Sequence, residues 1–139
     1  MKRFLSVAIF VLALTVTGCG DKYVTEEYNV RTKTIHYTVK STDWHRGSDV
    51  AGPYLYYAFD EPELTANIIN QGLVAAYMRL EGQFTPLPFE DFRIGENGYL
   101  YSEQVTCEFR TGEATFIFKT SDHILEPEFD YDFTLRIIW

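Results

Sequence analysis

Alternation of apolar and polar residues is the main pattern of this chain from residue 30 onward. Residues 32–40 alternate strictly, with an apolar face of Ile35, Tyr37 and Val39. Because successive side chains of a strand point to opposite faces, this period of two predicts a half-buried β-strand. Comparable patterns predict further strands over residues 54–59, 73–80, 89–94, 99–110, 114–119 and 133–139. Pro88 lacks an amide proton, so we expect the strand that follows it to lie at a sheet edge.

Turn signals and one short helix connect these strands. A polar loop is expected over residues 41–52, and Asn97-Gly98 predicts a tight hairpin turn with both residues at positive φ. Thr111-Gly112 predicts a second hairpin turn. Thr65 is the expected N-cap of a helix of one to two turns, which Gly72 would end in the left-handed conformation. Together these signals predict an all-β fold over residues 30–139, an antiparallel β-sandwich that is Ig-like or similar, with one short helix.

The first 18 residues predict a cleaved lipoprotein signal peptide. Lys2 and Arg3 precede an apolar stretch that is too short to span a bilayer, which takes about 20 residues. Small residues come directly before Cys19, as in a bacterial lipobox, so we expect cleavage there and acylation of Cys19. Two or more acyl chains, such as palmitate, hold a protein firmly on a membrane. The alternative is an ordinary signal peptide in which Cys19 is incidental.

The residues after Cys19 bear on the location of the protein. Residues 19–29 read as a lipidated cysteine followed by a polar tether. Gly20 stands where an Asp retains lipoproteins at the inner membrane, which favours the outer membrane and leaves its two sides open. If Cys19 is acylated, Cys107 has no partner for an intrachain disulfide. Its alternation with polar neighbours places Cys107 toward the core, as a small hydrophobe.

Several short motifs occur in a fixed order over most of residues 30–139. They are Asp43-Trp44, Tyr54-x-Tyr56-Tyr57, Pro62-x-Leu64-Thr65-x-x-Ile68, Gly72-x-Val74-x-x-Tyr77, Leu87-Pro88 and Phe133-x-Leu135-Arg136-Ile137-Ile138. In this combination the chain resembles a set of small, uncharacterised Bacteroidetes lipoproteins with a β-sandwich domain. The chain departs from their pattern in its terminal Trp139 and in its acidic approach to the last strand. The resemblance implies the fold and an envelope location, and it implies no activity.

Aromatic residues are the first candidates for ligand binding. Trp44 follows Asp43 at a strand end, where the ring is either a stacking platform for a sugar or a cap on the core. Tyr54, Tyr56 and Tyr57 place rings on both faces of one predicted strand. One face must pack in the core, and the other is available to a glycan, a peptide or a partner protein, unless loops cover it.

Acidic residues are the second candidates. Glu126, Glu128, Asp130 and Asp132 would lie on one side of an extended chain, where they could supply oxygen ligands to a structural Ca²⁺. The alternative is a solvated loop that keeps a sheet edge from pairing with other chains. The three histidines do not have the spacing of a zinc site, so no other cofactor is expected.

Charge and motifs narrow the function further. The net charge of −8 over 139 residues gives no electrostatic basis for binding nucleic acid. No nucleophile elbow, phosphate-binding loop or metalloprotease motif occurs. We therefore expect a non-catalytic envelope module that binds a glycan, a peptide or a protein. The alternatives are a structural subunit that assembles through its C-terminal strand at residues 133–139, and a hydrolase that uses clustered carboxylates. The oligomeric state stays open.

Overall fold

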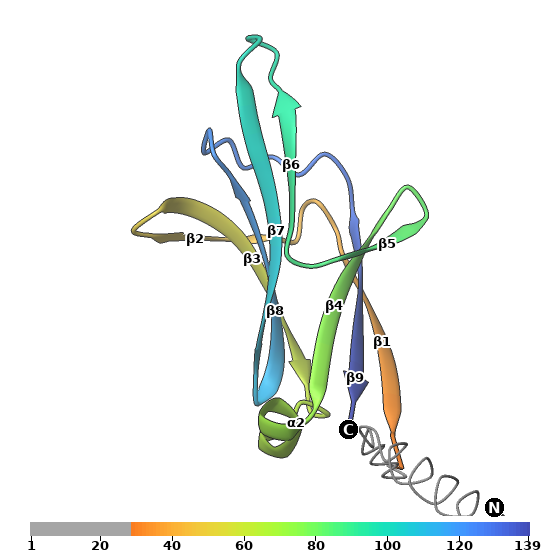
Figure 1. Cartoon of the computed structure of the whole chain (residues 1–139). Helices are drawn as coiled ribbons and strands as arrows, with labels where there is room; N and C mark the ends of the chain where they lie inside the picture. The colour runs from red at the N-terminus through yellow and green to blue at the C-terminus, as the bar shows by residue number, and fades with distance from the viewer. Residues whose placement is uncertain (1–28) are drawn as a thin grey trace, which may run out of the picture.

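The computed structural model describes residues 29–139, which form two antiparallel sheets and one short helix (Figure 1). The elements are β1 Thr32–Val39, β2 His45–Asp49, β3 Gly52–Glu61, α2 Ala66–Gln71, β4 Leu73–Leu80, β5 Gln83–Pro86, β6 Phe89–Ile94, β7 Leu100–Arg110, β8 Gly112–Thr120 and β9 Tyr131–Ile138. The smaller sheet has the order β1-β9-β4-β5, and the larger sheet has the order β2-β3-β8-β7-β6. The predicted all-β sandwich is confirmed. The predicted signal peptide, Cys19 and nearly all of the tether lie outside the described residues.

The core forms where the inner faces of the two sheets meet. The largest fully buried side chains are Phe116, Phe118, Phe133, Leu64, Leu135, Ile137, Val39 and Val105. Phe116 of the larger sheet stacks on Phe133 of the smaller sheet, with 3.9 Å between ring centroids. Removing an aromatic side chain of this size from water stabilises the fold by about 1.5–3 kcal/mol. The alternation seen in the sequence therefore sets which side chains the two sheets bury.

Helix α2 begins as the sequence predicts, but it ends for a different reason. The Thr65 hydroxyl oxygen accepts a hydrogen bond from the Ile68 amide at 3.3 Å, which confirms Thr65 as the N-cap. Gly72 is extended, with φ −88° and ψ −178°, so the predicted left-handed ending is wrong. A Cβ at this position would lie 2.8 Å from the Ile68 carbonyl oxygen and 2.9 Å from that of Ile138. Glycine is needed here for space between the helix and the end of β9.

The two predicted hairpin turns have different outcomes. At the Thr111-Gly112 turn, Gly112 has a φ of 79° and joins β7 directly to β8, as expected. At the other turn, Gly98 has a φ of 78° while Asn97 is not at positive φ, so the predicted turn type is wrong. The Gly95 amide donates to the Tyr99 carbonyl at 2.9 Å, which leaves a longer loop in which a single left-handed residue suffices.

Two short strands were not expected. β2 lies within the predicted loop of residues 41–52, and β5 lies between two predicted strands. Each is the outermost strand of its sheet. Residues of such edge strands are exposed on most sides, so they show little apolar alternation, and sequence periodicity misses them. The expected position of residues 89–94 at an edge is confirmed, since β6 is the outermost strand at the other side of the larger sheet.

The C-terminal strand lies inside its sheet. β9 pairs with β1 on one side and with β4 on the other. Both of its backbone edges are therefore already hydrogen-bonded, and assembly by adding a neighbouring chain to this strand has no free edge to use. A subunit that assembled through residues 133–139 would first have to displace β1 or β4. Trp139 follows the strand, and its amide and carbonyl pair with those of Arg31.

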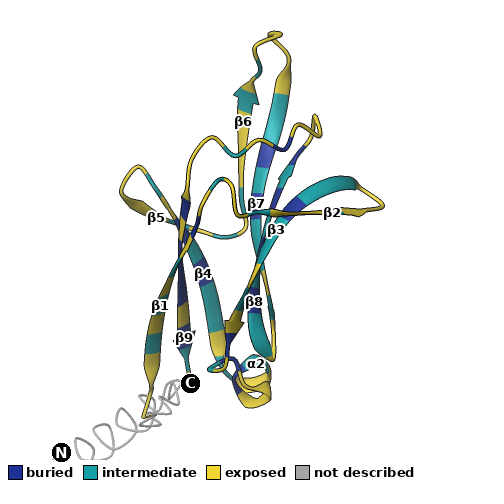
Figure 2. Cartoon of the chain, turned by 180° about the vertical axis from the view of Figure 1, so that it is seen from behind, coloured by how far each residue is buried: buried dark blue, intermediate teal, exposed yellow. Residues whose placement is uncertain are grey.

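The two ends of the sandwich differ. β1 begins beside the end of β9, at the same end as α2 (Figure 1). The hairpin of β6 and β7 extends past the other strands at the opposite end, and its tip consists of exposed residues (Figure 2). Among residues 29–139, none of the helical structure has the length and apolar character needed to cross a bilayer.

Candidate functional site

The four aromatic candidates are divided between the core and the surface. Trp44 packs against the core, with its ring 5.8 Å from that of Tyr131 and 6.4 Å from that of Phe133. Tyr57 points inward from β3 and also packs on the core. Tyr54 and Tyr56 instead lie on the outer face of β3, with 6.0 Å between ring centroids. The structure thus retains two of the four predicted residues as accessible rings and places the other two in structural positions.

Tyr54 is held in a defined position on the larger sheet. Its ring lies over Gly47 of β2, where a Cβ would come within 2.6 Å of the ring carbon. The ammonium group of Lys119 lies 5.2 Å from the ring centroid and 2.7 Å from a carboxylate oxygen of Asp49. The hydrogen bond from Lys119 lowers the pKa of Asp49 from its usual value. The backbone of Gly47 on one side and the ammonium group of Lys119 at the ring hold Tyr54 in place in the absence of a ligand.

A shallow depression lies beside the two rings. Tyr54 and Tyr56 line one side, and the small or branched side chains of Ala58, Thr115 and Ile117 also line it. Cross-strand pairing explains the hollow, because Tyr56 is opposite Ile117 and Ala58 is opposite Thr115. The short side chains border a cavity of 260 Å³ beside the tyrosine rings. The outer face of the sheet therefore offers an aromatic platform next to a small recess.

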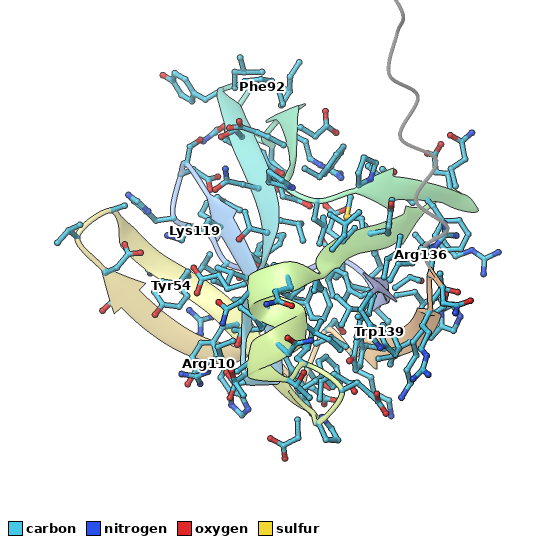
Figure 3. All side chains as sticks on the ribbon, turned by 60° about the horizontal axis from the view of Figure 1, so that its bottom comes forward. Tyr54, Phe92, Arg110, Lys119, Arg136 and Trp139 are labelled. Atoms are coloured by element: carbon cyan, nitrogen blue, oxygen red, sulfur yellow. The ribbon has the colours of Figure 1, made fainter. Side chains whose placement is uncertain are left out.

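Charged side chains line another part of the depression. Arg110 and Glu113 are opposite each other across the turn between β7 and β8, and they form an ion pair. The Thr115 hydroxyl donates to Glu113 at 2.9 Å, and this bond, together with Arg110, lowers the pKa of the Glu113 carboxyl. Glu108 is exposed and is opposite Thr115 in the sheet register. Figure 3 shows Tyr54, Lys119 and Arg110 on one side of the molecule, with Arg136 on the other. The site therefore presents both donors and acceptors.

The predicted calcium ligands Glu126, Glu128, Asp130 and Asp132 are all exposed and do not converge. Residues 121–130 form an irregular loop, so the period of two on which the prediction depended is absent until β9 begins. In the part of the chain that the structure describes, no group of three or more His, Cys, Asp or Glu side chains is arranged to hold a metal ion.

Three of these carboxylates contact donors of the protein instead. Asp132 accepts from the Thr38 hydroxyl at 2.7 Å, Asp130 accepts from the Ser41 amide at 2.9 Å, and Glu128 lies 4.0 Å from an Arg93 nitrogen. Asp130 and Glu128 join the acidic loop to Ser41, two residues after β1, and to Arg93 of β6, whereas Asp132 lies in β9 and bonds to Thr38 of β1. The loop thus links the two sheets at the end opposite α2.

A second hollow of 760 Å³ lies between this loop and the β6–β7 hairpin. It is lined by the carboxylates of Glu96, Glu103, Asp122, Glu126 and Glu128. The Glu103 carboxylate is nearly buried, accepts a hydrogen bond from the Tyr131 hydroxyl at 2.9 Å, and lies 3.3 Å from the Arg93 guanidinium. This hollow offers mainly acceptors, in contrast to the mixed polar and aromatic lining of the depression.

The remaining candidates for chemistry are dispersed. His36 contacts the Thr134 hydroxyl on the outer face of the smaller sheet, His45 lies in β2, and His123 lies in the loop after β8. Cys107 packs against the core from the inner face of β7. Burial raises the pKa of the Cys107 thiol, which keeps it protonated and poorly nucleophilic near neutral pH.

No protein-family model matches this sequence, and neither a curated protein nor a solved structure matches the chain. The geometry of the site is therefore the basis for assigning a function.

Sequence reasoning found the two accessible tyrosines but missed the residues that surround them. The missed residues belong to β7 and β8, which are distant from Tyr54 along the chain; they are Arg110, Glu113 and Lys119. The available signal was the alternation along β8, which places Glu113, Thr115 and Lys119 on the face opposite to the buried phenylalanines. That alternation indicates their face, but only the pairing of β3 with β8 brings them to the tyrosines.

Proposed function

We propose that this chain is a non-catalytic outer-membrane lipoprotein that binds an extended glycan on the outer face of its larger sheet. The observation that carries the proposal is the pair of accessible rings, Tyr54 and Tyr56, beside a recess with charged side chains. The envelope location rests on the signal peptide, Cys19 and the resemblance to lipoproteins described above. No nucleic acid, metal or other cofactor is part of the proposal.

A saccharide suits this combination of groups. One face of a pyranose ring carries C–H groups that pack on an aromatic ring, and the ring edge carries hydroxyls that hydrogen-bond to polar side chains. Tyr54 and Tyr56 would supply the packing surface, while Arg110 would donate and Glu108 would accept. The rings lose little conformational entropy on binding, because a tyrosine has only two side-chain torsions.

The size of the recess favours a polymer over an isolated metabolite. Pockets that enclose small molecules have volumes of about 300–1,000 Å³. The recess of 260 Å³ is smaller and lies on an open sheet face. One unit of a longer chain would occupy it while neighbouring units extend over the tyrosines.

The state of the carboxylates supports binding without catalysis. A glycosidase needs one carboxylic acid that is protonated near neutral pH and can donate to the leaving group. The pKa of Glu113 is lowered by its contacts with Thr115 and Arg110, which is the opposite of what a general acid needs. The hydrolase alternative would need a second, protonated carboxyl group beside it.

The test is a glycan array followed by titration of the strongest ligand against the wild type, Tyr54→Ala and Tyr56→Ala. An aromatic contact of this kind contributes about 0.5–1.5 kcal/mol, so each variant is expected to bind roughly 2- to 12-fold more weakly. Tyr99→Ala is the matched control, because Tyr99 is an exposed tyrosine in the β6–β7 turn, away from the depression.

The control is expected to bind as the wild type does. Equal affinities for the wild type and both tyrosine variants would exclude this face as the site. An array without any ligand would overturn the glycan proposal, and the same variants would then be compared with short extended peptides.

A further inference from the structure

The outer edge of β6 is a free edge of the larger sheet, and its backbone polarity is known from two hydrogen bonds. The Gly95 amide donates across the hairpin to the Tyr99 carbonyl at 2.9 Å. Because the direction of backbone groups alternates along a strand, the amides of Asp91 and Arg93 face β7, while those of Glu90, Phe92 and Ile94 face outward. In agreement, the Phe92 amide donates to the side chain of Asp91 at 2.9 Å.

This edge carries large apolar side chains in contact with solvent. Phe92 is 66% exposed and Ile94 is 75% exposed, and Leu100, which is opposite Ile94 in the register, is 67% exposed. The register of β6 with β7 places all three on the outer face of the hairpin, whose end projects beyond the other strands and is exposed (Figure 2). Free edges are usually blocked against association, so an edge with exposed apolar residues is a candidate interface.

The sequence of β6 is complementary to itself when two copies run antiparallel. With Phe92 opposite Phe92 of the second copy, Asp91 is opposite Arg93 and Glu90 is opposite Ile94. Outward amides then meet outward carbonyls, and outer side chains stay on the same face as outer side chains. Opposite charges at directly opposed positions stabilise a strand pair.

The charges also select one register. A shift that centres the pair on Asp91 places the two Asp91 carboxylates opposite each other, and a shift that centres it on Arg93 places two guanidinium groups opposite each other. Like charges in directly opposed positions destabilise a strand pair. A shift that pairs an odd-numbered residue of one copy with an even-numbered residue of the other would place an outer side chain opposite an inner one.

We propose that β6 pairs with β6 of a second copy of this chain, antiparallel and centred on Phe92, so that the two larger sheets become one continuous sheet. The Asp91 carboxylate leaves the Phe92 amide of its own chain and faces Arg93 of the other copy. The Phe92 amide is then free to donate to the Phe92 carbonyl opposite.

The two-fold axis of such a pair is perpendicular to the sheet, so the outer faces of both copies point in the same direction. If the proposed function is correct, the two tyrosine sites would face the same side and could bind one glycan chain together. A second site on the same ligand raises the apparent affinity without any new contact. This consequence rests on the proposed function, whereas the pairing itself does not.

Disulfide trapping tests the register directly. The parent is the full chain with Cys19→Ser, in which Cys107 is the only native cysteine and packs against the core. Phe92→Cys in this parent is expected to form a cross-linked dimer on mild oxidation, because hydrogen-bonded partners lie about 5.5 Å apart between Cα atoms, within disulfide range.

Ile94→Cys is the matched control, since Ile94 is even more exposed than Phe92 but would face Glu90 of the other copy. Alone it is expected to cross-link at least 10-fold more slowly, and mixed with Glu90→Cys it is expected to give a cross-linked heterodimer. Cross-linking of Phe92→Cys no faster than that of Ile94→Cys would overturn the register.

The mass in solution tests the association without an introduced cysteine. Light scattering of the detergent-solubilised parent is expected to give twice the chain mass. Asp91→Lys is expected to give the mass of one chain, because the introduced ammonium group would face Arg93 of the other copy. Glu96→Lys makes the same charge change in the turn beyond β6 and should remain dimeric. A parent with the mass of one chain up to millimolar concentration would overturn the proposal, whether or not the protein binds glycans.

Discussion

A hydrogen bond from Tyr37 to Glu61 connects the two sheets inside the sandwich. Tyr37 lies in β1 of the smaller sheet, and its hydroxyl donates to the Glu61 carboxylate of β3 in the larger sheet at 2.7 Å. Glu61 is only 6% exposed, and its other oxygen accepts from the Glu63 amide at 3.2 Å. We predict that Tyr37→Phe destabilises the protein, because the variant keeps the ring and removes only the hydroxyl.

The expected magnitude follows from the burial of the carboxylate. A hydrogen bond to a charged group contributes about 1.5–3 kcal/mol, and its loss leaves a nearly buried carboxylate oxygen without a partner. The aromatic contact between Tyr37 and Phe59, at 4.3 Å between centroids, is retained in the variant because the ring is unchanged. With a denaturant slope of about 2 kcal/mol/M in urea, a loss of about 2 kcal/mol lowers the unfolding midpoint by roughly 1 M.

The assay is equilibrium unfolding in urea, with Tyr56→Phe on the outer face as the matched control. The control is expected to change the free energy of unfolding by less than about 0.5 kcal/mol. Tyr37→Phe should also have a smaller effect in a Glu61→Gln background, because the oxygen left without a donor is then uncharged. A loss for Tyr37→Phe as small as that of the control, or one unchanged by Glu61→Gln, would refute the reasoning.

Three further predictions concern pH, the glycine at the end of the helix, and the proposed lipid. Burial, and after it the contacts with carboxylates, raises the pKa of Tyr37 and Tyr131 above the usual value of about 10. Because the tyrosines of the unfolded state ionise first, the stability that these two contribute should be complete below pH 10 and fall above it. Measuring the free energy of unfolding as a function of pH checks this, and Tyr37→Phe should make the fall less steep. Gly72→Ala should lower stability by about 1–3 kcal/mol in thermal unfolding, because the new methyl group meets two carbonyl oxygens. Cys19→Ser should move the protein from the membrane fraction to the soluble or uncleaved fraction, and an unchanged distribution would argue against acylation at Cys19.

Local patterns were sufficient to predict the strands that bury one face. Residues 73–80 alternate, and the structure places β4 over that same range with Ala76 and Met78 buried. Phe116 and Phe118 point together into the core as expected. Thr65 caps α2 because its hydroxyl acts only three residues along the chain. In each case the interaction or the burial depends on residues that are close in sequence.

The candidate site was predictable only in part. The tyrosines of β3 were identified, but which of them face solvent depends on which face of the strand meets the smaller sheet. Trp44 precedes β2, an edge strand with no alternation, so its position against Tyr131 and Phe133 had no local signal. The recess itself depends on Ala58 being opposite Thr115, a pairing that no single segment determines.

The amino-acid sequence by itself determined that the chain forms short strands with one buried face, because side-chain alternation is a property of the extended backbone. It also determined the helix start and the position of glycine at the turn after β7. Only the tertiary structure decided which strands are neighbours. The C-terminal strand lies between β1 and β4, and Lys119 reaches Tyr54, because such pairings depend on how two whole sheets share one core. The free edge at β6 is likewise a consequence of strand order, which local sequence does not encode.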